Sequence, residues 1–547
     1  MTSQKRRDWI WVAVFTAVYL LIQLLPYVIG YLTAPSDQFY TGLIMNPEDS
    51  QTYWAKMLQG FDGSWLYTIP FTHEIHGGAF VGVFYLFLGH VARWLGVSLT
   101  AVWHISRLIA GIILSLTTFH FVGQFLAERR VRWVAYLLAM TGSGLGWLLF
   151  LLGQTYWLGY FPVDFKQPGA HLFFTAMTFP HITLATALIM LIVCWLTQAV
   201  RGSIRAAVAA GFAQIFLSIL YPYLIYLTAV IAALAFGRHV WQEREGFLRR
   251  GIIVVVPFII PLPLNIYYAV ILQVNPVFRI WSDQSVTRSA PWPHYVLAYG
   301  IMLILAGWFW RQRPSSRPRF SILWAWIFAA AILIFSPVNA QRRFIQGVQA
   351  PLSILAAMGW FEVLLPRLQT TRFWQNLVAR PRYDSHRLAR FITVFFLLFM
   401  SLSNLFVIAD LLRVTAVAQP DPLFRLNVEL TAVRWLRENI PRTAVVLGDY
   451  QTGNYVAAHA GQRVVLGHWV ETVEYEAKTA DVARFFDAAV SDKWRREFLA
   501  RHGVDVVWVG PRERALGGFD PEMVSYLTPL YQVHTLRADV TLYATIP

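Results

Sequence analysis

The sequence is poor in charged residues and contains a single cysteine. Only 14% of its 547 residues are Asp, Glu, Lys or Arg, whereas 57% are hydrophobic. Soluble globular domains carry about 25% charged residues, so this composition excludes an ordinary cytosolic enzyme and a disordered protein. The single cysteine, Cys194, excludes an intrachain disulfide scaffold. The composition therefore predicts a polytopic membrane protein.

The charges are unevenly distributed along the chain. Residues 413–547 contain 15 basic and 16 acidic residues, whereas residues 1–412 contain 30 basic and 14 acidic residues. Helical and strand-like patterns alternate in the tail, so we expect a soluble α/β domain there. The tail contains no GxGxxG, P-loop or GxSxG motif, which argues against a second nucleotide-binding or hydrolase centre. The basic residues of the first part separate apolar runs, so membrane topology explains them and no nucleic-acid partner is expected.

Eleven apolar runs are candidates for membrane-spanning helices, each of which needs about 20 residues. The first follows Lys5–Arg7 and ends near Leu32. The others lie near 101–126, 133–152, 172–199, 206–220, 222–237, 251–272, 293–310, 320–337, 347–366 and 391–412. The two short runs meet at a hinge, Tyr221-Pro222-Tyr223.

The stretch 78–96 is apolar but interrupted by His90 and Arg93, so it either spans the membrane or lies in the interface. If it lies in the interface, 22 Lys and Arg residues fall in loops on one side and six on the other. The positive-inside rule favours this arrangement, with the N-terminus in the cytoplasm and the C-terminal domain outside. The predicted protein is mainly α, with about eleven spans over residues 1–412 in the cytoplasmic (plasma) membrane and an extracytoplasmic α/β domain over 413–547.

The first outer loop, about 34–77, contains a predicted short helix. Asn46 is typical of an N-cap, and Asp49, Tyr53 and Lys56 share one side of the helix, so Tyr53 and Lys56 are candidates for contacting the substrate. Asp49 at the third helical position is explained most simply as an acid favoured by the helix dipole. At a membrane surface, however, a carboxylate can also deprotonate a hydroxyl or hold a cation at a phosphate.

The acid pair Glu48–Asp49 at the start of this helix, with Tyr53 one turn later, resembles the GT-C glycosyltransferase superfamily. That superfamily includes protein O-mannosyltransferases, aminoarabinose transferases and oligosaccharyltransferases, which use polyprenyl-phosphate-linked sugars. An apolar interfacial stretch (80–95) and a second large outer loop (about 273–292) fit the same layout. The resemblance implies that Asp49 is a catalytic base or a metal-linked acid, with Glu48 as its substitute.

The resemblance also implies a second acid in the next outer loop, where Asp164 is the candidate. The alternative is a solvated loop acid paired with Lys166. In the tail, Asp449-Tyr450 is similar to part of an oligosaccharyltransferase motif, but the tryptophan pair and the following glycine of that motif are missing. A role in binding a peptide sequon is therefore not expected.

Basic residues on the outer side contradict the charge rule and suggest binding of a phosphate. Arg342 and Arg343 precede an aromatic residue, and guanidinium groups bind phosphate in a bidentate manner. The alternative is that they reach into lipid headgroups. Arg279 and Arg288, in the second large loop, are placed to assist.

Several histidines are further candidates. His73 and His76 are weak candidates for a metal pair, because zinc needs about three or four ligands; a divalent cation therefore stays an optional cofactor. His76 can instead bind a lipid phosphate or its own loop. His181, near the outer end of a span, is either a packing residue or a proton carrier. In the tail, the segment Gly467-His468-Trp469 with Glu471 can stack a sugar, although a loop Trp is more commonly a packing residue.

These observations lead to one main hypothesis. The protein is predicted to be an inverting GT-C-type glycosyltransferase of the cell envelope, with Asp49 as the base and Arg342 and Arg343 neutralising the departing phosphate. Its partners would be a polyprenyl-phosphate sugar, membrane lipid and a glycan, lipid or protein acceptor. A polytopic transporter or lipid flippase is one alternative, supported mainly by the hinge at Tyr221-Pro222-Tyr223. A non-catalytic glycan-binding or sensory membrane protein is the other.

Overall fold

The computed structural model describes residues 3–243, 246–312, 317–380 and 384–546. They fold into two compact units. The first unit comprises Met1–Leu24, Ser106–Ile266 and Thr287–Asp410, and the second comprises Leu25–Ile105, Tyr267–Val286 and Leu411–Pro547. Four of the predicted basic segments, 1–8, 237–250, 311–319 and 367–390, include residues outside the described ranges, namely 1–2, 244–245, 313–316 and 381–383.

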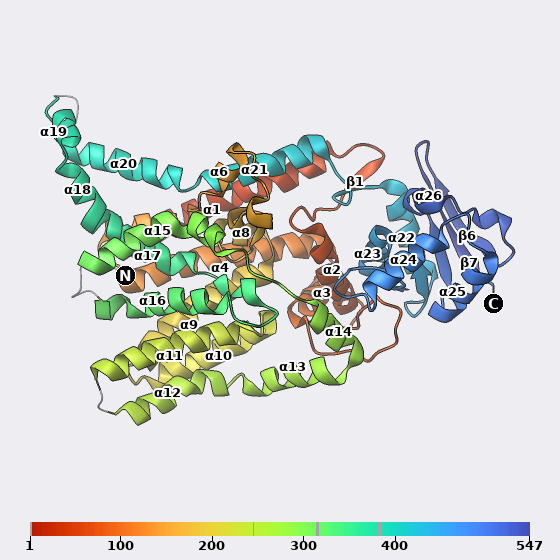
Figure 1. Cartoon of the computed structure of the whole chain (residues 1–547), viewed down its shortest axis with the longest axis horizontal. Helices are drawn as coiled ribbons and strands as arrows, with labels where there is room; N and C mark the ends of the chain where they lie inside the picture. Colours follow the sequence, from red (N-terminus) through yellow and green to blue (C-terminus); the bar gives the residue numbers. More distant parts are fainter. Residues whose placement is uncertain (1–2, 244–245, 313–316, 381–383, 547) are drawn as a thin grey trace. The chain divides into compact units, whose positions relative to one another are not determined.

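The first unit is built from helices that pack against one another (Figure 1). The helices are α1 (Ser3–Thr33), α4 (Leu99–Phe125), α5 (Arg129–Thr141), α6 (Gly146–Leu151), α7 (Val163–Lys166), α8 (Leu172–Met177), α9 (Pro180–Ala199), α10 (Ile204–Leu220), α11 (Leu224–Gln242), α12 (Phe247–Ile259), α13 (Leu262–Val274), α15 (Trp292–Gln312), α16 (Arg317–Leu333), η3 (Gln341–Ile345), α17 (Gln349–Gly359), α18 (Leu365–Gln369), α19 (Arg372–Val378), α20 (Ser385–Phe399) and α21 (Leu402–Arg413). Helix α10 packs between α9 and α12, and α17 packs between α5 and α15. Helices α1, α4, α13 and α21 continue into the second unit.

Six described helices are long and apolar enough to cross a membrane, and two bent pairs raise this number to eight if each pair is one span. The six are Gln4–Thr33, Leu99–Phe125, Pro180–Ala199, Leu224–Gln242, Trp292–Gln312 and Gln341–Gln369. The bent pairs are α12 with α13, at 49°, and α20 with α21, at 46°. Pro261 and Pro263 explain the first bend, because proline removes a backbone donor from the helix. The remaining predicted runs also contain helices, but α5, α10 and α16 have only 13, 17 and 17 residues.

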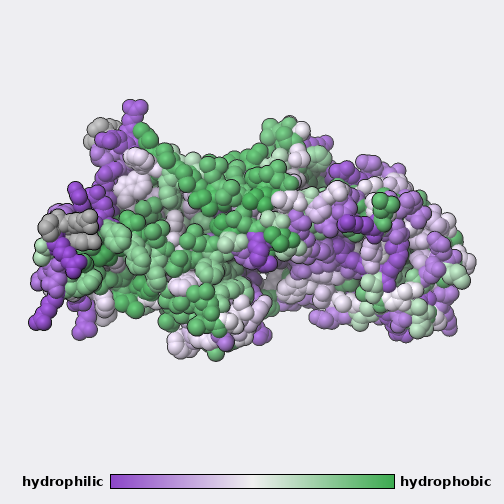
Figure 2. All heavy atoms as spheres, turned by 90° about the horizontal axis from the view of Figure 1, so that it is seen from above, coloured by the Kyte–Doolittle hydropathy of each residue, from purple (hydrophilic) through white to green (hydrophobic). Residues whose placement is uncertain are grey.

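Large apolar side chains remain exposed on these helices. On α1 alone, Trp11 and Leu21 are 56% and 62% exposed. The face shown in Figure 2 carries hydrophobic residues over much of the first unit. Exposure of so much apolar surface to water is unfavourable, whereas contact with lipid tails is not. Helices also satisfy their own backbone hydrogen bonds in lipid. The protein is a multi-pass membrane protein of mainly α-helical fold, as predicted.

In the second unit, a helix of the first loop packs closely against a helix of the stretch 78–96. These are α2 (Pro47–Phe61) and α3 (Val83–Leu95). A Cβ atom added to Gly60 would lie 2.0 Å from the Leu86 carbonyl oxygen, and one added to Gly89 would lie 2.0 Å from that of Met57. Glycine at both positions therefore allows the two backbones to touch. Helix α3, with 13 residues, falls in the ambiguous stretch 78–96 and is shorter than the roughly 20 residues of a span.

The rest of the second unit is an α/β domain, also as predicted. Its five-stranded sheet has the order β4-β3-β5-β7-β6, in which β4, β3 and β5 are parallel and β7 and β6 are antiparallel. The strands are β3 (Val445–Leu447), β4 (Arg463–Val464), β5 (Val506–Val509), β6 (Leu527–His534) and β7 (Asp539–Thr545). The helices are α14 (Pro276–Gln284), α22 (Asn427–Asn439), α23 (Tyr450–His459), α24 (Tyr475–Phe485), α25 (Asp492–His502) and α26 (Pro511–Gly517). A separate antiparallel pair joins β1 (Gln38–Tyr40) to β2 (Phe424–Leu426).

Candidate functional site

Asp49 lies in the first turn of α2, which begins at Pro47. Asn46 occupies the predicted N-cap position in a left-handed conformation, φ 47°, that Asn adopts more readily than most residues. It makes no side-chain cap hydrogen bond, because its amide donates to Asp49 Oδ2 instead. The residue before the helix therefore fixes one oxygen of the carboxylate.

A histidine of the α/β domain holds the other oxygen. His468 follows β4, and its Nε2 lies 3.2 Å from Asp49 Oδ1. The His468 side chain is 3% exposed, whereas the Asp49 side chain is 31% exposed. The carboxylate thus has fixed partners on one side and remains accessible on the other, which a general base requires.

Glu48, the neighbouring acid, also contacts the α/β domain. Gln451 Nε2 donates to Glu48 Oε1 at 3.3 Å, and the Tyr450 hydroxyl is hydrogen-bonded to the same carboxylate. Burial and the charge of Glu48 raise the pKa of Tyr450, so its hydroxyl stays protonated and available to Glu48. Both acids at the start of α2 are therefore held by residues that follow parallel strands of the sheet.

Lys56 lies further along the same helix and is buried. Its Nζ is 3.0 Å from Glu471 Oε1 and 4.0 Å from the centre of the Tyr67 ring. The Tyr67 hydroxyl donates to Glu471 Oε2 at 2.5 Å. Burial lowers the pKa of Lys56, although Glu471 and Asp49 oppose the shift. The predicted substrate contact of Lys56 stays a prediction, but its ammonium group is already paired. Tyr53, one turn before it, stacks on Tyr85 with ring centroids 4.5 Å apart.

The histidines of the first loop do not form a ready metal pair. His76 Nδ1 lies 2.9 Å from the Glu74 carbonyl oxygen, and His76 Nε2 accepts from the Ile69 N–H at 2.9 Å, so both nitrogens are engaged. His73 Nε2 instead lies 3.1 Å from Nδ1 of His502 on α25. Within the described ranges, no group of three or more His, Cys, Asp and Glu side chains is placed to hold a metal ion.

His73 sits in a positively charged part of the second unit. Lys478 Nζ is 2.6 Å from Glu74 Oε1, and an Arg463 guanidinium donates to the His73 carbonyl at 2.8 Å. Burial, reinforced by Lys478, lowers the pKa of His73 to about 4. Burial and Lys478 also lower the pKa of His502. These two histidines are therefore neutral near pH 7.

The predicted arginine pair lies on η3 in the first unit. The Arg343 guanidinium carbon is 5.6 Å from the centre of the Tyr221 ring, and the His181 ring is 5.2 Å from the same ring. The backbone N–H of Arg342 donates to the Thr287 carbonyl at 3.2 Å, next in sequence to the exposed Arg288. The structure thus brings His181, Tyr221 and Arg343 together. Arg279 lies apart from these residues in the chain, exposed on α14 of the second unit.

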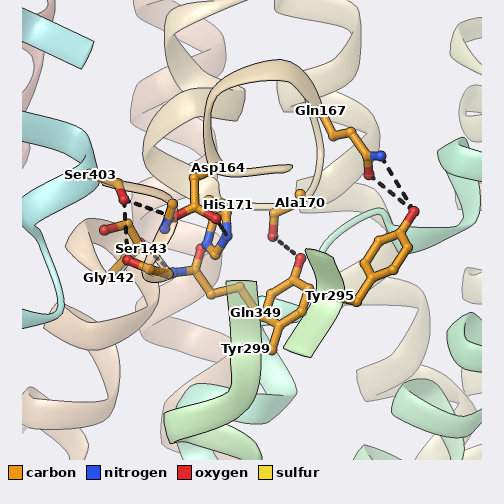
Figure 3. A network of polar contacts seen from close by, with 12 residues as sticks. Gly142, Ser143, Asp164, Gln167, Ala170, His171, Tyr295, Tyr299, Gln349 and Ser403 are labelled. Carbon is orange, nitrogen blue, oxygen red and sulfur yellow. Dashed lines mark hydrogen bonds and ion pairs between the residues drawn. The ribbon is translucent and has the colours of Figure 1, made fainter. Parts of the chain in front are cut away.

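Asp164 is buried in the first unit, so the alternative of a solvated loop acid is wrong (Figure 3). Its Oδ2 accepts from Ser403 Oγ at 2.8 Å and from the Gly146 N–H at 3.0 Å. His171 Nε2 lies 3.4 Å from Oδ1, and the His171 ring stacks on Tyr299. Lys166, the expected partner, lies over the Tyr160 ring instead. Burial alone would raise the pKa of Asp164, but these hydrogen bonds lower it overall.

The partners of the two first-loop acids were missed from the sequence. The sequence indicates a sugar-stacking segment around His468 and a partial motif at Asp449-Tyr450, but neither pattern predicts a contact with the first loop. His468 is 419 residues from Asp49 in the chain, so no local spacing signals this pair. These partners come within four residues of the ends of two strand-like runs of the sequence, Ala444–Leu447 and Arg463–Leu466, which is the one local signal.

Solved structures share this fold. ArnT from Cupriavidus metallidurans bound to undecaprenyl phosphate matches with a TM-score of 0.55 and 12% identity, over 97% of this chain and 98% of that chain. Arabinofuranosyltransferase AftD from Mycobacteria matches with a TM-score of 0.54 and 13% identity, over 98% of this chain and 40% of that one. The Archaeoglobus fulgidus oligosaccharyltransferase matches with a TM-score of 0.47 and 13% identity, over 90% of this chain and 69% of that one. No family model and no curated protein matches the sequence.

The likeness to ArnT extends over nearly the full length of both chains. The predicted fold, a multi-pass membrane part followed by an α/β domain, is therefore confirmed and is shared with ArnT.

Proposed function

We propose that this protein is an inverting membrane glycosyltransferase that transfers a sugar from a polyprenyl-phosphate donor to an acceptor hydroxyl. The observation that carries the proposal is the carboxylate of Asp49. It is 31% exposed, it is held by Asn46 and His468, and it lies in a chain with the fold of ArnT. A preorganised, accessible carboxylate suits general-base catalysis.

The proposed reaction has the following steps. Asp49 removes the proton of the acceptor hydroxyl, whose oxygen attacks the anomeric carbon as the bond to the donor phosphate breaks. The phosphate leaves with the bonding electron pair, and attack from the opposite face inverts the anomeric centre. Arg342 and Arg343 are the proposed partners of the phosphate, because guanidinium groups bind phosphate oxygens strongly. Among the described residues, no group of three or more His, Cys, Asp and Glu side chains is placed to hold a metal ion, and a divalent cation stays an optional cofactor of the proposed reaction.

The cellular placement is part of the same proposal. We place the membrane domain, residues 1–412, in the cytoplasmic membrane with the N-terminus inside, and the domain from residue 413 outside. The asymmetric distribution of Lys and Arg over the loops supports this orientation. The donor would then enter laterally from the lipid, and the acceptor from the outer side.

Asp49→Asn in the full-length protein tests the base. Membranes containing each variant are incubated with labelled undecaprenyl-phosphate sugars, and transfer to endogenous acceptors is followed. We expect Asp49→Asn to lower transfer about 10²- to 10⁴-fold, the range of a general base, with an unchanged melting temperature. Asp49→Asn with full activity would overturn the assignment. No transfer by the wild type would instead favour the transporter or glycan-binding alternatives.

The donor site has an independent test. Binding of undecaprenyl phosphate to purified protein is measured by native mass spectrometry. We expect Arg342→Ala and Arg343→Ala to weaken binding about tenfold, because each removes charge-assisted hydrogen bonds. Arg372→Ala, which changes an exposed arginine on α19, is the matched control. Equal weakening by all three variants would contradict a specific donor site.

A further inference from the structure

The parallel strands of the α/β domain end next to the start of α2. In the second unit, helix α2 packs against α23, which follows β3 (Figure 1). Carboxyl ends of parallel strands lie along one edge of a sheet, where α/β domains commonly bind ligands. His468 follows β4 and contacts Asp49, and Tyr450 follows β3 and contacts Glu48. The sheet edge at which other α/β domains bind ligands therefore contacts Glu48 and Asp49 in this protein.

The backbone around His468 is fixed. Its carbonyl accepts from the N–H groups of Glu471 at 2.8 Å and Thr472 at 2.9 Å. The Gly467 N–H donates to Thr472 Oγ1 at 3.1 Å, and the His468 ring lies edge-on to Phe71 at 6.0 Å. A ring held on a fixed turn presents its Nε2 in one direction, which is a precondition for positioning another group.

The polar contact of the His468 imidazole is with Asp49. His468 is buried, and among the described residues its Nδ1 has no hydrogen-bond partner, so Nε2 makes the polar contact of the ring. The charged groups nearby are Asp49 itself and the buried pair of Lys56 and Glu471, which neutralise each other. A buried polar side chain whose contact is directed at an accessible carboxylate is more than core packing requires.

We propose that His468 is a positioning residue for the base, so that the α/β domain completes the transfer site. The His468 imidazole donates from Nε2 to Asp49 Oδ1, while the Asn46 amide donates to Oδ2. The two donors restrict the rotation of the carboxylate and so fix how it meets the acceptor hydroxyl. This inference rests on the proposed function, and it assigns the acceptor side of the site to the segment that follows β4.

The test compares His468→Ala with His468→Gln in the full-length protein, using the transfer assay over a range of pH. We expect His468→Ala to lower kcat about 10- to 100-fold, the scale of a misplaced catalytic group. Because a hydrogen bond to a carboxylate favours its charged form, the acid limb of the pH–rate profile should also move to higher pH. His468→Gln retains an N–H donor at a similar reach and should recover most of the rate.

A matched control comes from the same unit. His459 is also a largely buried histidine, and its Nε2 lies 2.9 Å from Gln51 Oε1 on α2. His459→Gln should leave the acid limb in place. A movement of the limb in His468→Ala, with rescue by His468→Gln, supports positioning, because a role in packing alone predicts neither.

The outcomes separate this inference from the proposed function. If Asp49→Asn is inactive but His468→Ala has the wild-type rate and pH profile, the inference fails and the function stands. If His468→Ala loses activity only in proportion to a lowered melting temperature and His468→Gln gives no rescue, His468 is structural and the inference again fails. If the wild type shows no transfer, both fail.

Discussion

Each unit of this protein contains a carboxylate next to a histidine, and the two pairs differ in their access to solvent. In the second unit, Asp49 lies 3.2 Å from His468 with 31% of its side chain exposed. In the first unit, Asp164 lies 3.4 Å from His171, and both side chains are at most 2% exposed. The same two residue types therefore form a solvent-accessible pair in one unit and a closed network in the other.

The difference lies in the partners. Asp164 accepts from the Gly146 N–H at the start of α6 and from Ser403 on α21, so its carboxylate joins these two helices to α7. The Asp49 carboxylate contacts Asn46 and His468, and 31% of its side chain is exposed. Proximity of an acid to a histidine is thus no sign of catalysis by itself, and exposure decides which pair meets an acceptor.

Replacement of Asp164 should give the largest change in stability. Asp164→Ala leaves the Gly146 N–H without its acceptor, removes one of the two acceptors of the Ser403 hydroxyl and breaks the buried pair with His171. We expect a loss of about 3–5 kcal/mol. Thermal denaturation of the purified protein in detergent measures the effect. The control is Glu128→Gln, because Glu128 and Arg130 form an ion pair in which both side chains are 63% exposed; its effect should stay below about 1 kcal/mol.

The opposite result would break the comparison. If Asp164→Ala melts like the wild type but loses transfer, Asp164 takes part in the chemistry, as the resemblance to GT-C enzymes implies for a second acid. If Asp49→Asn lowers the melting temperature as strongly as Asp164→Ala does, then Asp49 is structural as well.

How far the sequence predicts these pairs depends on where the partners lie. The apolar runs, the basic loops and the alternating pattern of the tail predict the membrane helices and the α/β domain, because these signals are local. The position of Asp49 at the start of a helix can also be predicted from the sequence, because a helix start is indicated by a few adjacent residues. His468 and Ser403 lie 419 and 239 residues from their acids. Only tertiary folding reveals such contacts, and for that reason Asp164 could be taken for a solvated acid.

The next expected effect is a difference in acid sensitivity between the two units. The pKa of His73 is lowered to about 4 by burial and Lys478, so the folded state resists protonation while the unfolded chain takes up a proton below about pH 6.5. Stability should therefore fall as the pH decreases from about 6.5 to 4, by an amount on the order of 1–3 kcal/mol. The contact of His73 with His502 should weaken before the network of Asp164 does.

Hydrogen exchange at several pH values measures this difference. We expect faster exchange around residues 70–76 and 498–503 at pH 5 than at pH 7, with little change around Asp164. His73→Gln should flatten the pH dependence, whereas His534→Gln, at an exposed position on β6, should not. Equal acceleration in both units would show that the acid sensitivity does not arise at His73.

Trp469 offers a smaller and more specific effect. It follows His468 and is 42% exposed, whereas the segment around it is largely buried. If the site at Asp49 is accessible to a sugar acceptor, the ring is placed to stack on it, a contact worth about 0.5–1.5 kcal/mol. Trp469→Ala should then raise the KM for the acceptor about three- to tenfold with little change in kcat. A change in kcat alone would assign Trp469 to the support of His468 instead.

The smallest effect is expected at Asp62, an acid in the same loop as Asp49 that has no histidine partner among the described contacts. Its carboxylate lies 3.3 Å from an Arg437 nitrogen, with the two side chains 38% and 30% exposed, and 3.5 Å from Arg442 Nε. Solvent screens such pairs, so Asp62→Asn should cost less than about 1 kcal/mol and leave transfer and its pH profile unchanged. The melting temperature and the transfer rate of Asp62→Asn, measured together with those of Asp49→Asn, test this expectation. A loss of transfer equal to that of Asp49→Asn would mean that the negative charge of the loop, and not the geometry of one carboxylate, drives the reaction.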